Sequence, residues 1–198
     1  MRLRNPAAIL CGALLLIWPA WLNGYPLLFS DSGAFLHQTL GPLMIWDKPF
    51  VYGPFLHFGH WQISLWGPAL LQGVMLSHVL WLTQRVLRGQ VGAFGHLGIC
   101  GFAALATTAP FSAALLMPDV FAPLVVLGIF LLGFAASALS KAERVYLMAL
   151  TSLGIAAHLA HLPLALGLIL VALLLRFGRW PVRFLAMALP VVLAVALL

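Results

Sequence analysis

Long apolar runs recur from one end of this chain to the other, and they constrain its fold more than any motif does. Each run covers about 15 to 25 residues, close to the roughly 20 that a helix needs to cross the hydrocarbon core of a bilayer. Hydrophobic residues make up 64% of the chain and charged residues 7%, and the mean hydropathy is +1.09. This composition leaves no room for a soluble domain. We therefore expect an all-α polytopic membrane helical bundle, a single transmembrane domain over residues 1–198.

Seven hydrophobic segments are predicted, two of them short. They span residues 6–28, 62–83, 91–116, 120–139, 145–159, 163–175 and 184–198. The first segment is long for a secretory signal and no clear small-X-small cleavage site follows it, so we predict a retained helix. The last segment stops inside an apolar run at Leu198, and we expect that the chain is either truncated or unusually short for a protein of its kind.

The basic residues are distributed asymmetrically between the segments. With the N-terminus inside, all clusters of basic residues face the cytoplasm: Arg2/Arg4, Arg85/Arg88, Lys141/Arg144 and Arg176/Arg179/Arg183. Lys48 is the one basic residue left outside. This distribution satisfies the positive-inside rule, and separated clusters are not typical of a nucleic-acid-binding patch. The sequence thus predicts a multi-pass protein of the plasma (inner) membrane, with the lipid bilayer as its surroundings and no nucleic acid as partner.

The same orientation places three of the four acids, Asp31, Asp47 and Asp119, on the outer face. Glu143 falls inside, where we expect an ordinary ion pair with Lys141 or Arg144. Reactive chemistry is therefore expected on the periplasmic or extracellular side.

The first outer loop, residues 24–60, is the only long connection. Ser30, Asp31 or Ser32 can cap a short helix that stops at Gly41, and interfacial aromatic residues such as Trp46 follow. We expect one or two amphipathic helices along the outer membrane surface.

A second candidate for a functional site is the polar turn inside the apolar run from Val145 to Leu175. One helix over this run would be about 46 Å long, too long for an untilted crossing, and Pro163 supplies a break. The turn that begins at His158 should then lie below the outer surface, where backbone must be buried in protein or line a water-filled cavity.

These residues also have structural explanations. Asp31 and Asp119 can each cap a helix, and glycines at 89, 92, 95, 98 and 101 indicate close helix packing. Two alternatives for function stay open as well. A broken helix with intramembrane polar groups suits a transporter or channel component. The histidine pairs His57/His60 and His158/His161, each at i,i+3 spacing, suit a metal or haem protein.

Four short segments, taken in order, resemble the N-terminal part of the C-type (GT-C) polytopic membrane glycosyltransferases. They are Tyr25-Pro-Leu-Leu-Phe-Ser-Asp-Ser32, Asp47-Lys-Pro-Phe-Val-Tyr52, Met117-Pro-Asp-Val120 and His158-Leu-Ala-His-Leu-Pro-Leu164. The resemblance covers about residues 1–198. It places Asp31 at the family's first-loop acid and Asp119 at the acid that opens the fourth helix.

The resemblance implies inverting transfer of a sugar from a polyprenyl-phosphate carrier to an acceptor at the outer face. Asp31 would then be the general base, and Asp119 would orient the acceptor or assist. The implied substrate-binding residues are Asp47, Lys48, Tyr52, His158 and His161, of which Lys48 and the two histidines would stabilise the leaving phosphate.

Many members carry two adjacent acids where this chain has Ser30-Asp31-Ser32. The metal ligands therefore stay unknown, and a divalent cation stays open as the cofactor. No phosphate-cradling glycine loop is visible, which is consistent with a donor held in the bilayer.

Overall fold

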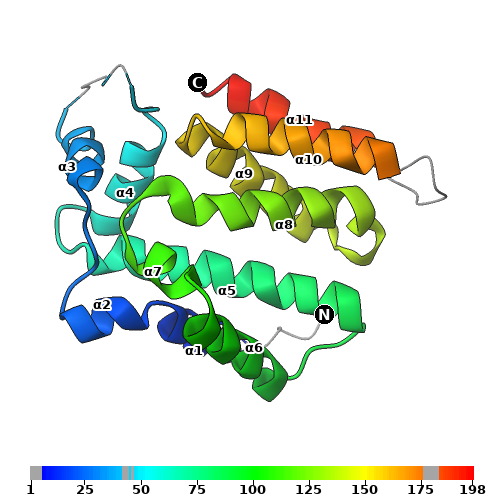
Figure 1. Cartoon of the computed structure of the whole chain (residues 1–198), viewed down its shortest axis with the longest axis horizontal. Coiled ribbons are helices and arrows are strands. Elements are labelled where there is room, and N and C mark those ends of the chain that lie inside the picture. The colour runs from blue at the N-terminus through cyan, green and yellow to red at the C-terminus, as the bar shows by residue number, and fades with distance from the viewer. Residues whose placement is uncertain (1–5, 42–44, 46, 176–182) are drawn as a thin grey trace. The chain divides into compact units, whose positions relative to one another are not determined.

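The computed structural model describes residues 6–41, 45, 47–175 and 183–198 (Figure 1). These residues form helices joined by turns and contain no β-strand, so the all-α class is confirmed. The chain divides into two compact units. Unit 1 comprises Met1–Leu43 and Gly53–Val120, and unit 2 comprises Met44–Tyr52 and Phe121–Leu198. Several residues of the predicted topology lie outside the described parts: Arg2, Arg4, Trp46, Arg176 and Arg179.

Unit 1 is built around one long helix and several short ones. Its elements are α1 (Pro6–Leu16), α2 (Trp18–Asn23), α3 (Ser30–His37), α4 (Tyr52–His60, whose first residue belongs to unit 2), α5 (Trp66–Arg88), α6 (Ala93–Ala106), α7 (Ala109–Ala114) and the 3-10 helix η1 (Pro118–Val120). α1 contacts both α5 and α6. These contacts form the core of the unit.

The predicted first segment, 6–28, is two helices and not one. α1 ends at Leu16, and α2 begins directly afterwards with Pro19 in its first turn, where proline needs no hydrogen-bond donor. Gly24, at φ 75°, closes α2 in the left-handed conformation that glycine adopts without strain. The segment predicted over 91–116 is divided in the same way into α6 and α7.

Two helices, α3 and α4, lie in the loop predicted over 24–60, and their position at a membrane surface stays a prediction. None of the three residues expected to cap α3 occupies its N-cap position, although Ser32 bonds to the residue that does. The N-cap position is Phe29, and Ser32 accepts the Phe29 N–H at 2.9 Å from within the first turn. This bond satisfies one of the donors that a helix start leaves open. The helix ends at His37 and not at Gly41.

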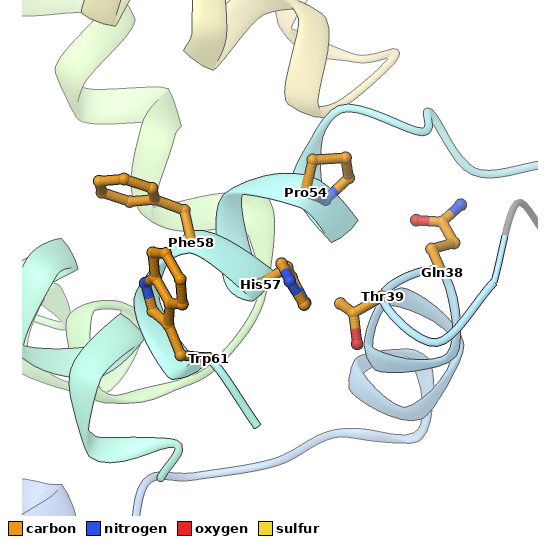
Figure 2. A pocket seen from close by; sticks show the side chains of 6 residues that line it. All are labelled: Gln38, Thr39, Pro54, His57, Phe58 and Trp61. Atoms are coloured by element: carbon orange, nitrogen blue, oxygen red, sulfur yellow. The ribbon is translucent and has the colours of Figure 1, made fainter. Parts of the chain in front are cut away.

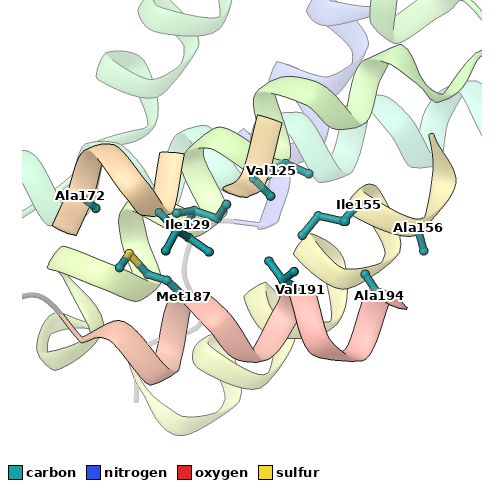
Figure 3. Packing of buried hydrophobic residues seen from close by; sticks show 10 residues of the cluster. Val125, Ile129, Ile155, Ala156, Ala172, Met187, Val191 and Ala194 are labelled. Carbon is teal, nitrogen blue, oxygen red and sulfur yellow. The ribbon is translucent and has the colours of Figure 1, made fainter. Parts of the chain in front are cut away.

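Unit 2 is a bundle of four helices, α8 (Phe121–Phe134), α9 (Lys141–Ala157), α10 (His161–Leu175) and α11 (Phe184–Val195), with the 3-10 helix η2 (Ala136–Ala138) after α8. Buried aliphatic side chains from all four fill its core (Figure 3), among them Val125, Ile155, Ala172 and Val191. Gly128 allows close approach of α9, because a Cβ there would collide with Thr151. Small residues of this kind let helix backbones come together.

A capping box begins α9. Ser140 Oγ accepts the Glu143 N–H at 3.3 Å, and a carboxylate oxygen of Glu143 accepts the Ser140 N–H at 2.9 Å, so two open donors are satisfied reciprocally. Glu143 is 7% exposed. Glu143 therefore serves the helix start, and its ion pair with Lys141 or Arg144 stays a prediction.

The predicted break between the two short segments is present but lies earlier than expected. α9 ends at Ala157 and α10 begins at His161, so residues 158–160 form the break. Pro163 falls in the first turn of α10, where its missing N–H has no intrahelical partner to lose. Proline fits a helix start as well as a helix end.

The five glycines between 89 and 101 do not mediate close packing within the described residues. A Cβ built on any of them meets no heavy atom within 4 Å. The prediction of close packing at these glycines is therefore wrong for this part of the chain. Close approach occurs instead at Gly12 and Gly73, where α1 meets α5.

Among the described residues, no single helix has both the length and the hydropathy expected of a membrane crossing. α5 and α6 reach these values only as a pair, and the chain bends by 119° between them. The membrane spans and their orientation stay predictions.

Candidate functional site

In unit 1, the chain before Asp31 runs beside the chain before Asp119. Leu27 N–H donates to Ala114 O, and Leu116 N–H donates to Leu27 O, each at 2.9 Å. The two bonds form an isolated parallel bridge between Leu27 and Leu115. Segments almost ninety residues apart in sequence are thereby held side by side.

Two buried polar side chains strengthen this link. Ser32, 0% exposed, donates its hydroxyl hydrogen to Leu116 O at 2.8 Å. Gln72 of α5, also 0% exposed, donates to Ala113 O at 3.0 Å and to Leu115 O at 2.9 Å. The segment that leads to Asp119 is therefore fixed to α3 on one side and to α5 on the other.

The two acids sit at the ends of these fixed segments. Asp31 is half-buried in the first turn of α3, where the helix N-terminus stabilises negative charge. Asp119 is exposed in η1. The arrangement offers one carboxylate at the start of a helix and a second on a segment bonded to that helix.

The predicted substrate-binding residues all belong to unit 2. Lys48 Nζ lies 3.0 Å from a carboxylate oxygen of Asp47, and the exposed fractions of the two side chains are 15% and 44%. A phosphate at Lys48 would compete with this carboxylate. Tyr52 is fully buried, with its ring edge-to-face against Phe121 at 6.2 Å between ring centres. This is the position of a packing residue.

The two histidines at the break in unit 2 are both bonded to backbone. His161 is 5% exposed, and its Nδ1 lies 2.7 Å from Gly154 O, so Nδ1 carries a hydrogen because a carbonyl can only accept. His158 Nδ1 accepts the Ala160 N–H at 3.1 Å. The ring centres are 5.1 Å apart. His161 thus ties the start of α10 to α9, a structural role that does not depend on a ligand.

Metal ligation by the histidine pairs gains no support from the described residues, which hold no group of three or more His, Cys, Asp or Glu side chains placed to bind one ion. His57 and His60 lie edge-to-face with 5.4 Å between ring centres.

A buried polar cluster between α1, α5 and α6 was not anticipated from the sequence. Ser77 donates to Ile9 O at 2.7 Å, so it must accept from His96 Nε2, 3.0 Å away. Gln84 Nε2 lies 3.0 Å from His96 Nδ1 and donates to it. Both contacts define the same neutral tautomer, with the hydrogen on Nε2. The spacing of Ser77 and Gln84, i and i+7 on one face of α5, was the available signal.

Comparison with models of known protein families, with curated proteins and with solved structures found no match to this chain.

Proposed function

We propose that this protein is an integral membrane glycosyltransferase that moves a sugar from a polyprenyl-phosphate carrier to an acceptor at the outer face of the membrane. The observation that carries the proposal is the hydrogen-bonded link between Ser32 at the start of α3 and Leu116, shortly before Asp119. It joins the two segments that bear the acids implied by the family resemblance.

In this reaction Asp31 takes the proton of an acceptor hydroxyl while the oxygen of that hydroxyl attacks the anomeric carbon. The bond from that carbon to the carrier phosphate breaks, its electron pair leaves with the phosphate, and the configuration at the carbon inverts. Asp31 acts in its ionised form, and it lies in the first turn of α3. Asp119 orients the acceptor.

The two acids and the hydrogen-bonded link between their segments all lie in unit 1. The phosphate-stabilising role of Lys48, His158 and His161 follows only from the resemblance, and the carboxylate of Asp47 already accompanies Lys48. The membrane location is supported by the composition and by the distribution of basic residues.

The test is sugar transfer by the full chain in membranes, with a panel of polyprenyl-phosphate sugars as donors. We expect Asp31→Asn and Asp31→Ala to lower kcat by about 100-fold or more, the usual contribution of a general base. Ser30→Ala is the matched control, because Ser30 is exposed in the same helical turn. Unchanged turnover in both Asp31 variants, at normal expression, would remove Asp31 as the base.

A second candidate, a transporter or channel component, is favoured by the bend of 119° between α5 and α6. Discontinuous helices of this kind form substrate sites in many transporters. Solute uptake into liposomes that contain the purified chain, without sugar transfer, would favour this candidate over the transferase.

A further inference from the structure

Two adjoining pockets lie in unit 1 between the end of α3 and the helix α4. The first has a volume of about 400 Å³, with Gln38 and Thr39 on one side and, on the other, Phe58 of α4 and Trp61, which directly follows α4 (Figure 2). The second, of about 490 Å³, shares Thr39 and reaches His60. Both volumes are in the range of small-molecule sites. Together they are called the α3–α4 pockets.

Gln38, which lines the first pocket, has a buried side-chain amide without a hydrogen-bond partner among the described residues. The residue is 3% exposed, and neither its Nε2 nor its Oε1 bonds to any described residue. Gly53 leaves the space for this side chain, since a Cβ there would lie 2.7 Å from Gln38 Cβ. A buried donor and acceptor without partners destabilise the unliganded protein. A ligand that offers both hydrogen-bonding types would remove this cost.

His60, which lines the second pocket, also carries a buried polar atom. It is 7% exposed, and its Nδ1 accepts the Gln62 N–H at 2.7 Å, so the hydrogen of the neutral ring lies on Nε2. That Nε2 has no partner among the described residues. Burial, and then the neighbouring His57, lower the pKa of His60. The ring is therefore neutral at pH 7 and offers one donor.

The turn that follows α4 is strained, and it borders both pockets. Trp61 and Gln62 adopt φ values of 45° and 58°, in the left-handed region that costs a side-chain-bearing residue about 1–2 kcal/mol. Trp61 lines the first pocket and Gln62 the second. Strain of this kind is retained where the surroundings require it. Here it directs the Gln62 N–H to His60 and leaves the Trp61 ring 66% exposed.

The chemistry of the lining favours a neutral ligand with many hydroxyl groups and an apolar face. No Asp, Glu, Lys or Arg is among the residues described around the two pockets, so a phosphate or nucleotide would lack a counter-charge. A lipid chain would leave Gln38 and His60 without partners. A pyranose ring has hydroxyl groups for both side chains and a C–H face that packs on an aromatic ring.

We propose that the α3–α4 pockets bind a neutral saccharide, the sugar-bearing acceptor, which Gln38 and His60 hold by hydrogen bonds and Trp61 by ring packing. The identification of the saccharide as the acceptor rests on the proposed transferase function. The second pocket extends to Gly33, in the same turn of α3 as Asp31. An acceptor held there is bound on the helix that carries the base.

The test is equilibrium binding to the full chain in lipid nanodiscs, measured by saturation-transfer NMR on methyl glycosides of glucose and N-acetylglucosamine. Nanodiscs avoid detergents with sugar head groups, which would compete. An N-acetylated amino-acid methylamide serves as the peptide comparator. We expect saturable binding of at least one glycoside and none of the peptide.

The key variant is Gln38→Met, which keeps the length of the side chain and removes its polar atoms. We expect affinity to fall about tenfold or more, as loss of one or two hydrogen bonds requires, while the thermal midpoint stays equal or rises. A merely structural Gln38 would show the reverse. Trp61→Ala should also weaken binding, whereas Phe94→Ala, an aromatic residue 90% exposed on α6, should not.

Three results would overturn the inference: no glycoside binds saturably, Gln38→Met binds as wild type does, or only the peptide comparator binds. The binding experiment contains no polyprenyl-phosphate sugar, so its outcome does not depend on whether the protein transfers sugar. Intact binding with no transfer contradicts the transferase, and intact transfer with binding unaffected by Gln38→Met contradicts only the pocket.

Discussion

The hydroxyl of Ser32 donates a hydrogen bond of 2.8 Å to the carbonyl oxygen of Leu116, across 84 residues of sequence. The same hydroxyl accepts the Phe29 N–H, so one oxygen both completes the start of α3 and attaches it to the segment before Asp119. The position of Asp31 therefore depends on a neighbour that carries no charge.

Replacement of Ser32 by alanine should lower both stability and activity. Ser32→Ala leaves the Leu116 carbonyl and the Phe29 N–H without this partner, at a cost of about 1–3 kcal/mol in the free energy of unfolding. We expect kcat to fall more than KM changes, because Ser32 positions the base and does not touch the substrate. Ser30→Ala, exposed in the same turn, should leave both the thermal midpoint and kcat near wild type. Equal effects of the two variants would contradict this role.

A pair of glycine substitutions tests the packing of α1 against the buried cluster. In Gly12→Ala the new Cβ would lie 2.6 Å from Ser77 Oγ and 2.9 Å from His96 Nε2, so the helices must shift, at about 1–3 kcal/mol. Gly98→Ala meets no described atom within 4 Å and should stabilise α6 by about 0.5–1 kcal/mol. The thermal midpoint measured by circular dichroism should fall below that of the wild type in Gly12→Ala and rise above it in Gly98→Ala. A harmless Gly12→Ala would exclude the tight contact.

One helix position followed closely from an apolar run that ends at charge and glycine. The run predicted over 62–83 became α5, which ends at Arg88 before Gly89. The two missed interruptions, at Ile17 and Thr107, each lie two or three residues before a proline, Pro19 and Pro110, inside runs that were predicted as continuous. Long-range contacts accompany them: the Trp18 indole N–H of α2 donates to Ala104 O of α6 at 3.0 Å. Local composition carries no information about such a contact.

The candidate site was predicted in part. Asp31 and Asp119 were identified because acids are rare in this chain, but their connection depends on backbone bonds of Leu27 and Leu116, which no side-chain pattern encodes. Gln38 was missed for a similar reason. A glutamine after a short helix is usually solvated, and only the burial created by the glycine at position 53 makes its amide significant.

Acid should destabilise the protein through His60. The pKa of His60 in the folded state lies below the ordinary value of 6.5, because burial and then His57 disfavour the charged ring. Below pH 6.5 the unfolded chain binds a proton that the folded chain does not, so the free energy of unfolding falls as the pH drops towards the folded-state pKa. Above pH 6.5 both states are neutral and the effect disappears.

We therefore expect the thermal midpoint to fall between pH 7.5 and pH 5, and to fall less steeply in His60→Asn, whose amide oxygen can still accept the Gln62 N–H. His37→Asn is the control, because His37 is exposed on α3. The same pH slope in wild type and His60→Asn would exclude His60 as the source.

The predicted membrane orientation can be measured with cysteine labelling in intact cells. Asp47→Cys should react with a membrane-impermeant maleimide, because position 47 lies in the loop that the positive-inside rule assigns to the outer side. That loop contains a single Lys or Arg residue, Lys48. Leu87→Cys, at a position 67% exposed between Arg85 and Arg88, should react only after the cells are opened. Both variants are made in a Cys11→Ala background, since Cys11 is exposed, while the buried Cys100 is kept as an internal negative control. Labelling of both positions from the same side would contradict the orientation, and with it the assignment of Asp31 to an outward-facing site.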